Sequence, residues 1–402
     1  MRYKLKEIFE LQMGKTPSRH NSSYWNTGDY KWISIADLSN VGKYISETKE
    51  TISESAVIES GIKIIPANTV VMSFKLSIGK TAITAEDMYS NEAIMAFHDK
   101  KIVELLPEYI YYLFKFKDWN VGSNKAVMGK TLNKATLAEM EIEIHTIEEQ
   151  KEIIKVLDQI SNIIANRKQE LIQLDNLIQA RFVEMFGDPI MNPKGWNVVT
   201  IKDIVTEVRY GTSKPAVEGG KYPYLRMNNL TLNGQLDLKN LKYIDIPDEE
   251  IEKCVVRKGD VLFNRTNSID LVGKTAVFNL VEDMVIAGYI IRIRLNEKLL
   301  PEVFSQYMNL KALKDVLRAM AKGAVNQANI NAQELQSIKV YLPDMDIQKQ
   351  FIKIKDQIDK SKFVIHKFLY CFIDNKQSII KPRLNTKESG KIRGGKPHAD
   401  EF

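Results

Sequence analysis

This chain of 402 residues contains two copies of the tripeptide Gly-Lys-Thr, whose residue types suggest phosphate binding. They lie at 79–81 and 273–275, and the same tripeptide ends the phosphate-binding loop of many nucleotide-hydrolysing proteins. That loop needs a second glycine five positions earlier, because its backbone amides cradle the phosphates. Phe74 and Ser268 occupy those positions. Both copies therefore predict a tight turn between strands and not a nucleotide site.

Other catalytic and metal-binding patterns are also missing from the sequence. The five histidines, His20, His98, His145, His366 and His398, are scattered and have no zinc-site spacing. The segment Asn-Pro-Lys-Gly at 192–195 lacks the aromatic residue that stacks on a flipped base in amino-methyltransferases. No glycine-rich dinucleotide fingerprint is present. The sequence predicts a recognition protein without catalytic residues, a metal site or a bound cofactor of its own.

Charge and hydropathy narrow the class of protein further. The net charge of +6 is only mildly basic, so an anion-binding surface must be a local patch. Cys254 and Cys371 are too few for a disulfide framework, which fits a reducing compartment. No apolar stretch approaches the roughly 20 residues that cross a bilayer. We expect a soluble, cytoplasmic protein without a membrane partner.

An internal repeat organises the chain. The segment EEQKEIIKVLDQI (148–160) matches DIQKQFIKIKDQI (346–358) at seven of thirteen positions, including Gln150/Gln348, Asp158/Asp356 and Gln159/Gln357. Earlier segments match in the same order: 3–11 with 199–207, 69–83 with 260–277, and 106–115 with 300–309. Agreement is weakest in the polar loops. A shared scaffold with different loops indicates one task performed on two targets.

Each half ends in a long helix with seven-residue spacing of apolar residues. The first carries Ile153, Leu157, Ile160, Ile164, Leu171, Leu174, Ile178 and Met185, and the second carries Phe351, Ile358, Ile365, Phe372 and Ile379. Sustained heptads predict a coiled-coil seam. The first helix has five Lys/Arg against seven Asp/Glu and the second nine against four, which favours pairing of the two. We expect the helices to pack antiparallel, with the two halves related by a pseudo-two-fold axis.

Each half begins with about 145 residues in which short strand-like runs alternate with short helical pieces. The predicted fold class is α+β, with two similar globular domains separated by two long antiparallel helices. The expected bounds are 1–145 for the first domain, 146–190 for the first helix and junction, 191–345 for the second domain, 346–383 for the second helix, and 384–402 for a polar tail, expected to be disordered. Gly187 and Pro189 should end the first helix.

The chain resembles the specificity (S) subunit of Type I restriction-modification systems. The resemblance lies in the repeated helix motif EEQK…DQI together with RFVEMFGDP…NPKGW at the junction, and it covers about residues 1–383. It implies two target recognition domains, each binding half of a split sequence in double-stranded DNA. It also implies that the helices bind two modification (M) subunits. S-adenosylmethionine would belong to those M subunits, and ATP and Mg to restriction (R) subunits.

The resemblance and the chemistry of base edges select candidate DNA contacts. Arg, Lys, Asn and Gln recognise base edges, while Ser, Thr and Lys also bind phosphate. In the first domain the candidates are Lys15, Thr16, Ser18, Arg19, Lys75, Ser77, Lys130 and Asn133. In the second they are Ser213, Lys214, Arg226, Asn228, Asn229, Arg265, Asn267, Lys274, Gln327, Asn329 and Asn331.

Roles follow from residue type within this set. Arg265 and Asn267 are expected to contact bases and Lys274 to contact phosphate. Each single residue has an ordinary alternative as a turn or helix cap. Tyr24, Trp25 and Trp32 are expected in the core and not as base-stacking platforms.

Apolar residues near the end of the first helix suggest where partners bind. Leu177, Phe182 and Phe186 are predicted to remain exposed on the helix and to contact M subunits. Two alternatives for the whole chain stay open. One is a tandem nucleic-acid-binding adaptor outside restriction, and the other is a self-contained DNA methyltransferase or nuclease.

Overall fold

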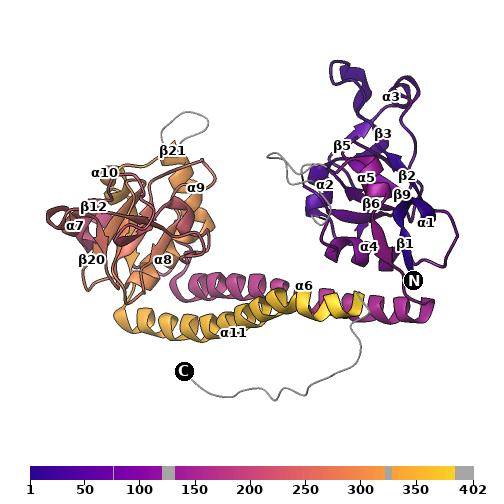
Figure 1. Cartoon of the computed structure of the whole chain (residues 1–402). Coiled ribbons are helices and arrows are strands. Elements are labelled where there is room, and N and C mark those ends of the chain that lie inside the picture. The colour runs from indigo at the N-terminus through magenta and orange to yellow at the C-terminus, as the bar shows by residue number, and fades with distance from the viewer. Residues whose placement is uncertain (76, 120–131, 322–327, 385–402) are drawn as a thin grey trace, which may run out of the picture. The chain divides into compact units, whose positions relative to one another are not determined.

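The computed structural model describes residues 1–75, 77–119, 132–321 and 328–384, with the side chains of 372–384 excepted. Lys130, Gln327, the side chains of Phe372 and Ile379, and the tail after 384 lie outside the described residues. The chain forms two compact units (Figure 1). The first unit is Met1–Asn166 with the chain from Phe368 onward, and the second is Arg167–Lys367. The boundaries fall within the two long helices, whereas the predicted domain boundaries lay at the helix ends.

Each unit contains mixed helix and sheet, as predicted. The elements of the first globular part are β1 (Arg2–Lys4), α1 (Leu5–Ile8), β2 (Phe9–Met13), η1 (Ser22–Tyr24), β3 (Trp25–Ile33), α2 (Ile35–Asn40), β4 (Tyr44–Ile45), β5 (Glu50–Ile52), α3 (Glu54–Ser60), β6 (Val70–Ser73), β7 (Thr81–Thr84), β8 (Tyr89–Ser90), β9 (Ile94–Asp99), α4 (Pro107–Phe116), α5 (Lys134–Ala138) and β10 (Glu141–Glu143).

The second globular part repeats this series with a few additions. Its elements are β11 (Asn197–Thr200), η2 (Ile201–Ile204), β12 (Val205–Tyr210), β13 (Tyr222–Leu225), η3 (Met227–Asn229), β14 (Lys242–Ile244), α7 (Asp248–Cys254), β15 (Val255–Val256), β16 (Val261–Asn264), β17 (Thr266–Asn267), β18 (Thr275–Val277), β19 (Met284–Ile286), β20 (Ile290–Leu295), α8 (Pro301–Asn309), α9 (Lys311–Met320), β21 (Ala328–Asn329), α10 (Ala332–Gln336) and β22 (Lys339–Leu342).

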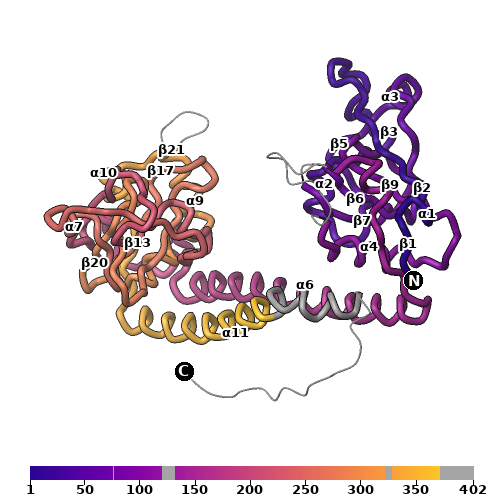
Figure 2. The backbone as a smooth tube through the Cα atoms, viewed as in Figure 1, coloured from indigo at the N-terminus to yellow at the C-terminus, as the bar shows by residue number. Residues whose placement is uncertain are grey.

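Sheet topology confirms the internal repeat. The main sheet has the order β2-β9-β6-β7-β4 in the first unit and β12-β20-β16-β18 in the second, so four strands correspond in order. Figure 2 traces the backbone through both units. A second sheet follows the order β5-β3-β8 in one unit and β14-β13-β19-β15 in the other. In both second sheets the central strand, β3 or β13, pairs parallel with β8 or β19. The same chain pattern therefore builds the same pair of sheets twice.

Strands β6 and β16 lie at interior positions of the main sheets, and each is apolar at its first three residues. VVMS and VLFN are buried at all four positions, which is typical of a strand covered on both faces. Helix α4 packs against β6 and β7, and helix α8 packs against β18. Each helix begins with proline at its first position, where the missing amide costs no hydrogen bond. The packed sheet and helix form the core that supports the loops.

The two long helices are confirmed. Helix α6 spans Ile147–Phe186 and α11 spans Met345–Leu384. Gly187 ends α6 with a φ of 88°, a left-handed conformation that glycine adopts without steric cost. Within the second unit the helices run antiparallel, because Phe182 contacts Phe351 at 5.2 Å between ring centroids while Asp175 bonds Lys362 further along α11.

A buried glutamine explains why the same sequence motif occurs at the start of both long helices. Gln150 has no exposed surface. Its Oε1 accepts a hydrogen bond from the Leu106 amide at 3.0 Å, and its Nε2 donates to the carbonyls of Glu104 and His145 at 2.9 and 3.0 Å. This glutamine therefore fastens the start of α6 to the loop that enters α4.

Gln348, at the matching position of α11, makes the same set of bonds. Its Oε1 accepts from the Leu300 amide at 2.9 Å, and its Nε2 donates to the carbonyls of Lys298 and Pro343 at 3.1 and 2.8 Å. It too is fully buried. The repeated sequence thus encodes a connection between helix and domain as well as a heptad face.

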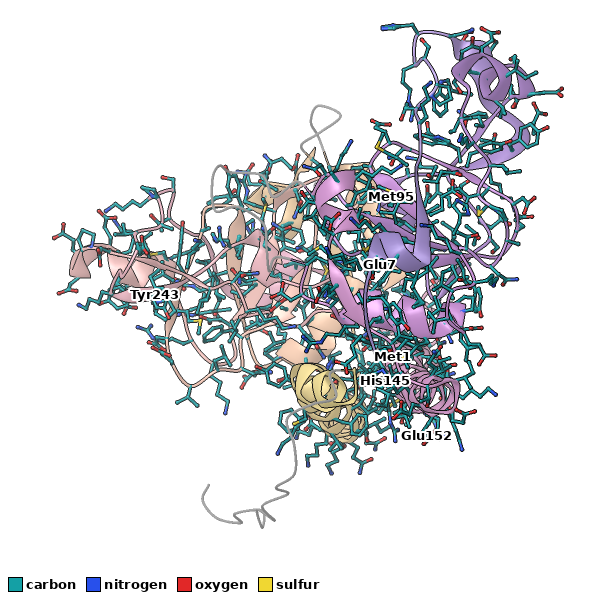
Figure 3. All side chains as sticks on the ribbon, turned by 45° about the vertical axis from the view of Figure 1, so that its right-hand side comes forward. Met1, Glu7, Met95, His145, Glu152 and Tyr243 are labelled. Atoms are coloured by element: carbon teal, nitrogen blue, oxygen red, sulfur yellow. The ribbon has the colours of Figure 1, made fainter. Side chains whose placement is uncertain are left out.

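The N-terminus meets the start of α6. In Figure 3, Met1 and His145 are labelled next to one another, and Glu152 of α6 is labelled below them. The Met1 amino group donates to the Ile144 carbonyl at 2.7 Å, and β1 pairs antiparallel with β10. The first unit is therefore closed by its own first strand at the point where the long helix begins. The second unit repeats this closure with β11 and β22.

Candidate nucleic-acid interface

Arg265 lies between β16 and β17, and its side chain contacts the ring of Tyr210. Its backbone is fixed on both sides, because its amide donates to the Tyr289 carbonyl at 3.0 Å and its carbonyl accepts from the Ile330 amide at 2.9 Å. Its guanidinium lies 4.9 Å from the centre of the Tyr210 ring. Among the described residues its buried Nε has no hydrogen-bond partner. This half-buried arginine therefore lies over the ring of Tyr210, and no ion pair within the described residues engages its guanidinium.

Asparagines surround Arg265 and shape the loop. Asn264 donates through Nδ2 to the carbonyls of Thr266 and Tyr289, and Asn267 donates through Nδ2 to the Asn264 Oδ1 at 2.8 Å. Thr266 Oγ1 donates to Asn329 Oδ1 at 3.2 Å, where β17 pairs with β21. Asn267 and Asn329 are thus half-buried members of a local network. The predicted contacts of Asn267 with bases and of Asn329 with DNA stay predictions.

The predicted residues in the polar loop around η3 differ in their exposure to solvent. Asn228 is exposed. Arg226 is half-buried and donates through Nη2 to the Asn240 carbonyl at 3.2 Å. Asn229 is 2% exposed, accepts from the Arg226 amide and donates to the Asp237 carbonyl, both at 2.8 Å. The prediction that Asn229 contacts bases is wrong, because its amide is used inside the loop.

Lys274 was also predicted incorrectly. It is 5% exposed, and its Nζ donates to the Met227 carbonyl at 2.6 Å. Burial lowers the pKa of Lys274 below its ordinary value. A side chain directed into the protein cannot contact phosphate. It connects the turn before β18 to the η3 loop, so its role is to fix one candidate loop against another.

Both Gly-Lys-Thr segments are turns between strands, as predicted. Gly79 and Gly273 have φ values of 90° and 80°. Their amides donate to Ser73 and Asn264 at the ends of β6 and β16, at 2.9 and 2.8 Å. The lysine of each segment therefore directly precedes a strand, β7 or β18, and neither segment forms a phosphate-binding loop.

Two predicted asparagines are helix caps. Asn133 accepts through Oδ1 from the Thr136 amide at 2.7 Å and begins α5. Asn331 accepts from the amides of Gln333 and Glu334, both at 2.9 Å, and begins α10. These caps occupy equivalent positions of the two units. Contact of either residue with DNA stays a prediction.

Ser213 and Lys214 follow β12 in an exposed segment. Ser213 is exposed and Lys214 half-buried. The Nζ of Lys214 lies 2.8 Å from a carboxylate oxygen of Glu250. At this partly exposed position the ion pair contributes little to stability. A phosphate could therefore replace the carboxylate at small cost.

In the first unit, Arg19 is exposed and stacks on Trp25, with its guanidinium carbon 3.6 Å from the ring centre. It also forms two hydrogen bonds with the Glu50 carboxylate, at 2.5 and 3.0 Å. The Arg19 guanidinium holds the pKa of Glu50 below its usual value. Tyr24 and Trp32 are buried at 7% and 2% exposure, which confirms the core assignment. Trp25 is half-buried and packs edge-on to Trp32.

The remaining candidates of the first unit lie in two loops. Lys15 and Ser18 are exposed, and Thr16, Lys75 and Ser77 are half-buried. Lys15 donates to the Ser60 carbonyl and Thr16 to the Glu92 carboxylate. The Lys75 ammonium lies 5.2 Å from the Phe74 ring centre, and the Ser77 amide donates to the Lys75 carbonyl. Unlike Arg265, none of these side chains is held above an exposed aromatic ring.

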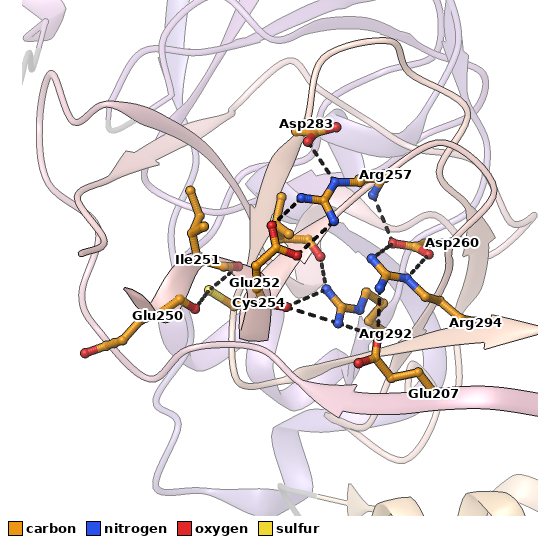
Figure 4. A network of polar contacts seen from close by, with 11 residues as sticks. Glu207, Glu250, Ile251, Glu252, Cys254, Arg257, Asp260, Asp283, Arg292 and Arg294 are labelled. Atoms are coloured by element: carbon orange, nitrogen blue, oxygen red, sulfur yellow. Dashed lines mark hydrogen bonds and ion pairs between the residues drawn. The ribbon is translucent and has the colours of Figure 1, made fainter. Parts of the chain in front are cut away.

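A charged network links β12, which ends in Tyr210, with β20 and with Asp260 before β16 (Figure 4). Arg292 on β20 is fully buried and donates to Glu207 on β12 at 2.7 Å. Arg294 donates to Glu207 at 2.9 Å and to Asp260, just before β16, at 2.8 Å. Desolvation lowers the pKa of Arg292. These arginines hold three strands together and their charge is compensated internally.

The helix residues predicted to contact partners need correction. Phe182 and Phe186 have no exposed surface. They pack against Phe351 at 5.2 and 5.5 Å and belong to the core of the second unit. The prediction that they form an exposed docking surface is wrong, because α11 and the globular part cover them. Leu177 is 41% exposed, and its role in partner binding stays a prediction.

The sequence analysis missed Tyr210, which supports Arg265. Tyr210 is 44% exposed, and its hydroxyl accepts a hydrogen bond from the Ala332 amide at 2.8 Å. Its place directly before the polar segment GTSKP is the only indication in the sequence. Over the described residues, no three or more His, Cys, Asp or Glu side chains are placed to hold a metal ion together. No helix there has the length and apolarity to cross a membrane.

Comparison with known proteins also finds two similar halves in this chain. A family model described as Type I restriction modification DNA specificity domain matches residues 1–176 and 193–373. The MjaIX specificity subunit, a Type I restriction enzyme subunit of Methanocaldococcus jannaschii, is 32% identical over 56% of this chain and 57% of the relative. The chain thus spans about half the length of the curated relatives it matches.

Two solved structures have the same fold. One, from a study of complex assembly and conformational transition of the type I R-M system, has a TM-score of 0.61 at 16% identity, covering 96% of this chain and 97% of the other. The other, a Type I restriction-modification system S subunit from M. genitalium, has a TM-score of 0.50 at 14% identity and covers 96% of each chain. Because the family model matches both halves, and both halves build the same sheets, the chain belongs to the Type I restriction modification DNA specificity domain family.

Proposed function

We propose that this chain is the DNA-binding specificity subunit of a Type I restriction-modification complex. Each globular part recognises one half of a bipartite target in double-stranded DNA, and the chain itself carries out no catalysis. The observation that carries this proposal is the duplication: the family model matches twice, and the two matched parts share sheets but differ in their polar loops. Bases specify a site, so loops that differ predict half-sites that differ.

The partners follow from this proposal. Two M subunits, which hold S-adenosylmethionine, bind along the helices, and R subunits, which use ATP and Mg, join the complex in the cytoplasm. Because Phe182 and Phe186 are buried, the docking surface is the apolar part of the helices that remains exposed in the second unit. Its residues are Ile172, Leu177, Val183, Phe363 and Val364, with exposed fractions of 41–68%. Exposed apolar groups of this kind mark interfaces.

Expression of the chain with an M subunit from the same source, in cells without other adenine methylation, tests the function. Sequencing of the methylated genome should show one bipartite motif whose two halves are separated by unspecified bases. Methylation at unrelated single sites would exclude the proposal, and so would a complex that methylates nothing although both subunits are folded.

Two substitutions test the docking surface. Phe363→Asp and Leu177→Asp place a charge on exposed positions, so both variants should fold and lose the M subunit on co-purification. Exposed Gln357, changed to Asp, is the matched control on α11 and should retain it. Undiminished co-purification of M with Phe363→Asp and Leu177→Asp would place the docking surface elsewhere.

A further inference from the structure

The loops after β6 and β16 leave their sheets through the same backbone bonds. Phe74 donates its amide to the Ala93 carbonyl at 3.0 Å, and its carbonyl accepts from the Leu132 amide at 3.2 Å. Arg265 makes the same two bonds with the corresponding strand and loop of its own unit. Phe74 is 1% exposed, whereas Arg265 is half-buried with its guanidinium above a ring. One backbone position therefore carries a core phenylalanine in one unit and a half-buried arginine in the other.

Tyr210 also has a counterpart at the same backbone position. Tyr210 and Met13 each precede a glycine, Gly211 or Gly14, whose amide donates at 3.1 Å to the first residue of β20 or β9. An added Cβ on either glycine would lie 2.2 Å from a backbone oxygen, so both sites require glycine. This close approach fixes the preceding side chain beside the loop. Met13 and Tyr210 are similarly exposed, at 46% and 44%.

We infer that Arg265 and Tyr210 form a single guanine-recognition contact, in which Arg265 binds the base edge and Tyr210 is the positioning residue. This inference rests on the proposed DNA-binding function. The guanidinium is planar and offers paired donors that match O6 and N7 of guanine in the major groove. The guanidinium carbon of Arg265 lies 4.9 Å from the centre of the Tyr210 ring. The face of this ring attracts the cation and fixes the orientation of the guanidinium plane. Because the Tyr210 hydroxyl is bonded to the Ala332 amide, the ring itself cannot turn freely.

The same positions in the first unit lack this chemistry. Phe74 and Met13 have no hydrogen-bond donor in their side chains, so that unit cannot make the contact at the equivalent point. The double substitution Tyr210→Met with Arg265→Phe therefore installs, on a matching backbone, side chains that the first unit already accommodates. It removes the guanine contact with a low risk of unfolding.

The experiment measures binding of the complex with M to duplexes in which each base pair of both half-sites is changed in turn. Arg265→Ala should abolish the preference for guanine at one base pair of one half-site, a change of roughly 5- to 150-fold. Tyr210→Leu should reduce the preference at that same base pair by roughly 2- to 5-fold. Tyr210→Phe, which keeps the ring, should retain most of it, and the double substitution should match Arg265→Ala.

Two further measurements distinguish recognition from scaffolding. Replacing the guanine by 7-deazaguanine, which lacks N7, should weaken binding by the unsubstituted chain and leave Arg265→Ala unaffected. In the Arg265→Ala background, Tyr210→Leu should have no further effect on base preference. An equal loss on every duplex for Tyr210→Leu, or a loss at another base pair, would overturn the inference. Uniform binding of all duplexes by the unsubstituted chain would instead refute the proposed function.

Discussion

Replacing Gln348 by methionine tests whether the repeated helix start fastens α11 to its domain. Methionine has a similar volume but neither donates nor accepts the bonds that glutamine makes with Leu300, Lys298 and Pro343. Three backbone groups in a fully buried site then lose a partner. A net hydrogen bond contributes about 1 kcal/mol, and an unsatisfied buried group costs about 1–3 kcal/mol. At about 1–1.5 kcal/mol for each of the three groups, the lower part of that range, we expect a loss of about 3–5 kcal/mol in the free energy of unfolding of the second unit.

The measurement is calorimetry of the whole chain combined with amide hydrogen exchange. At about 2–4 °C per kcal/mol for a unit of this size, the transition of the second unit should fall by roughly 6–20 °C. The Leu300 amide, which bonds only to Gln348 in the described contacts, should exchange faster. Gln357→Met is the matched control, because Gln357 also belongs to the repeated motif but is exposed. Equal effects of Gln348→Met and Gln357→Met would refute the assigned role of the repeat.

The remaining predictions concern stability within the second unit. Burial lowers the pKa of Lys314 from 10.5 to about 7. Between about pH 7 and 10.5 the unfolded state therefore binds one more proton than the folded state, and the free energy of unfolding should rise with pH across that window. Lys314→Met should flatten this rise, as measured by urea unfolding at pH 6 and pH 9, and an unchanged pH dependence would contradict the assignment. Phe182→Ala should cost about 3–5 kcal/mol in urea unfolding, whereas Leu177→Ala should cost under about 1 kcal/mol, because only the phenylalanine is buried. Asn331→Ala removes the cap of α10 and should cost about 1 kcal/mol; no loss of stability would mean that solvent replaces the cap.

Much of the fold follows from local sequence pattern. The repeat, the two long helices and their ends, the buried strands and the turns at Gly79 and Gly273 all depend on periodicity or on residues close in sequence. The α+β class and the duplication could therefore be predicted, together with the resemblance to the family.

The tertiary structure determines which side chains are exposed and can contact DNA or a partner protein. Phe182 was predicted to be exposed because its helix was considered alone, yet Phe351, from the far end of the chain, covers it. Lys274 looked like a surface lysine until the Met227 carbonyl, 47 residues away, was found to bind it. Arg265 became distinct from its neighbours only when Tyr210 was placed beneath it. The physical reason is the same in each case: heptads and turns arise from contacts within a few residues, whereas burial and pairing depend on segments that the fold brings together.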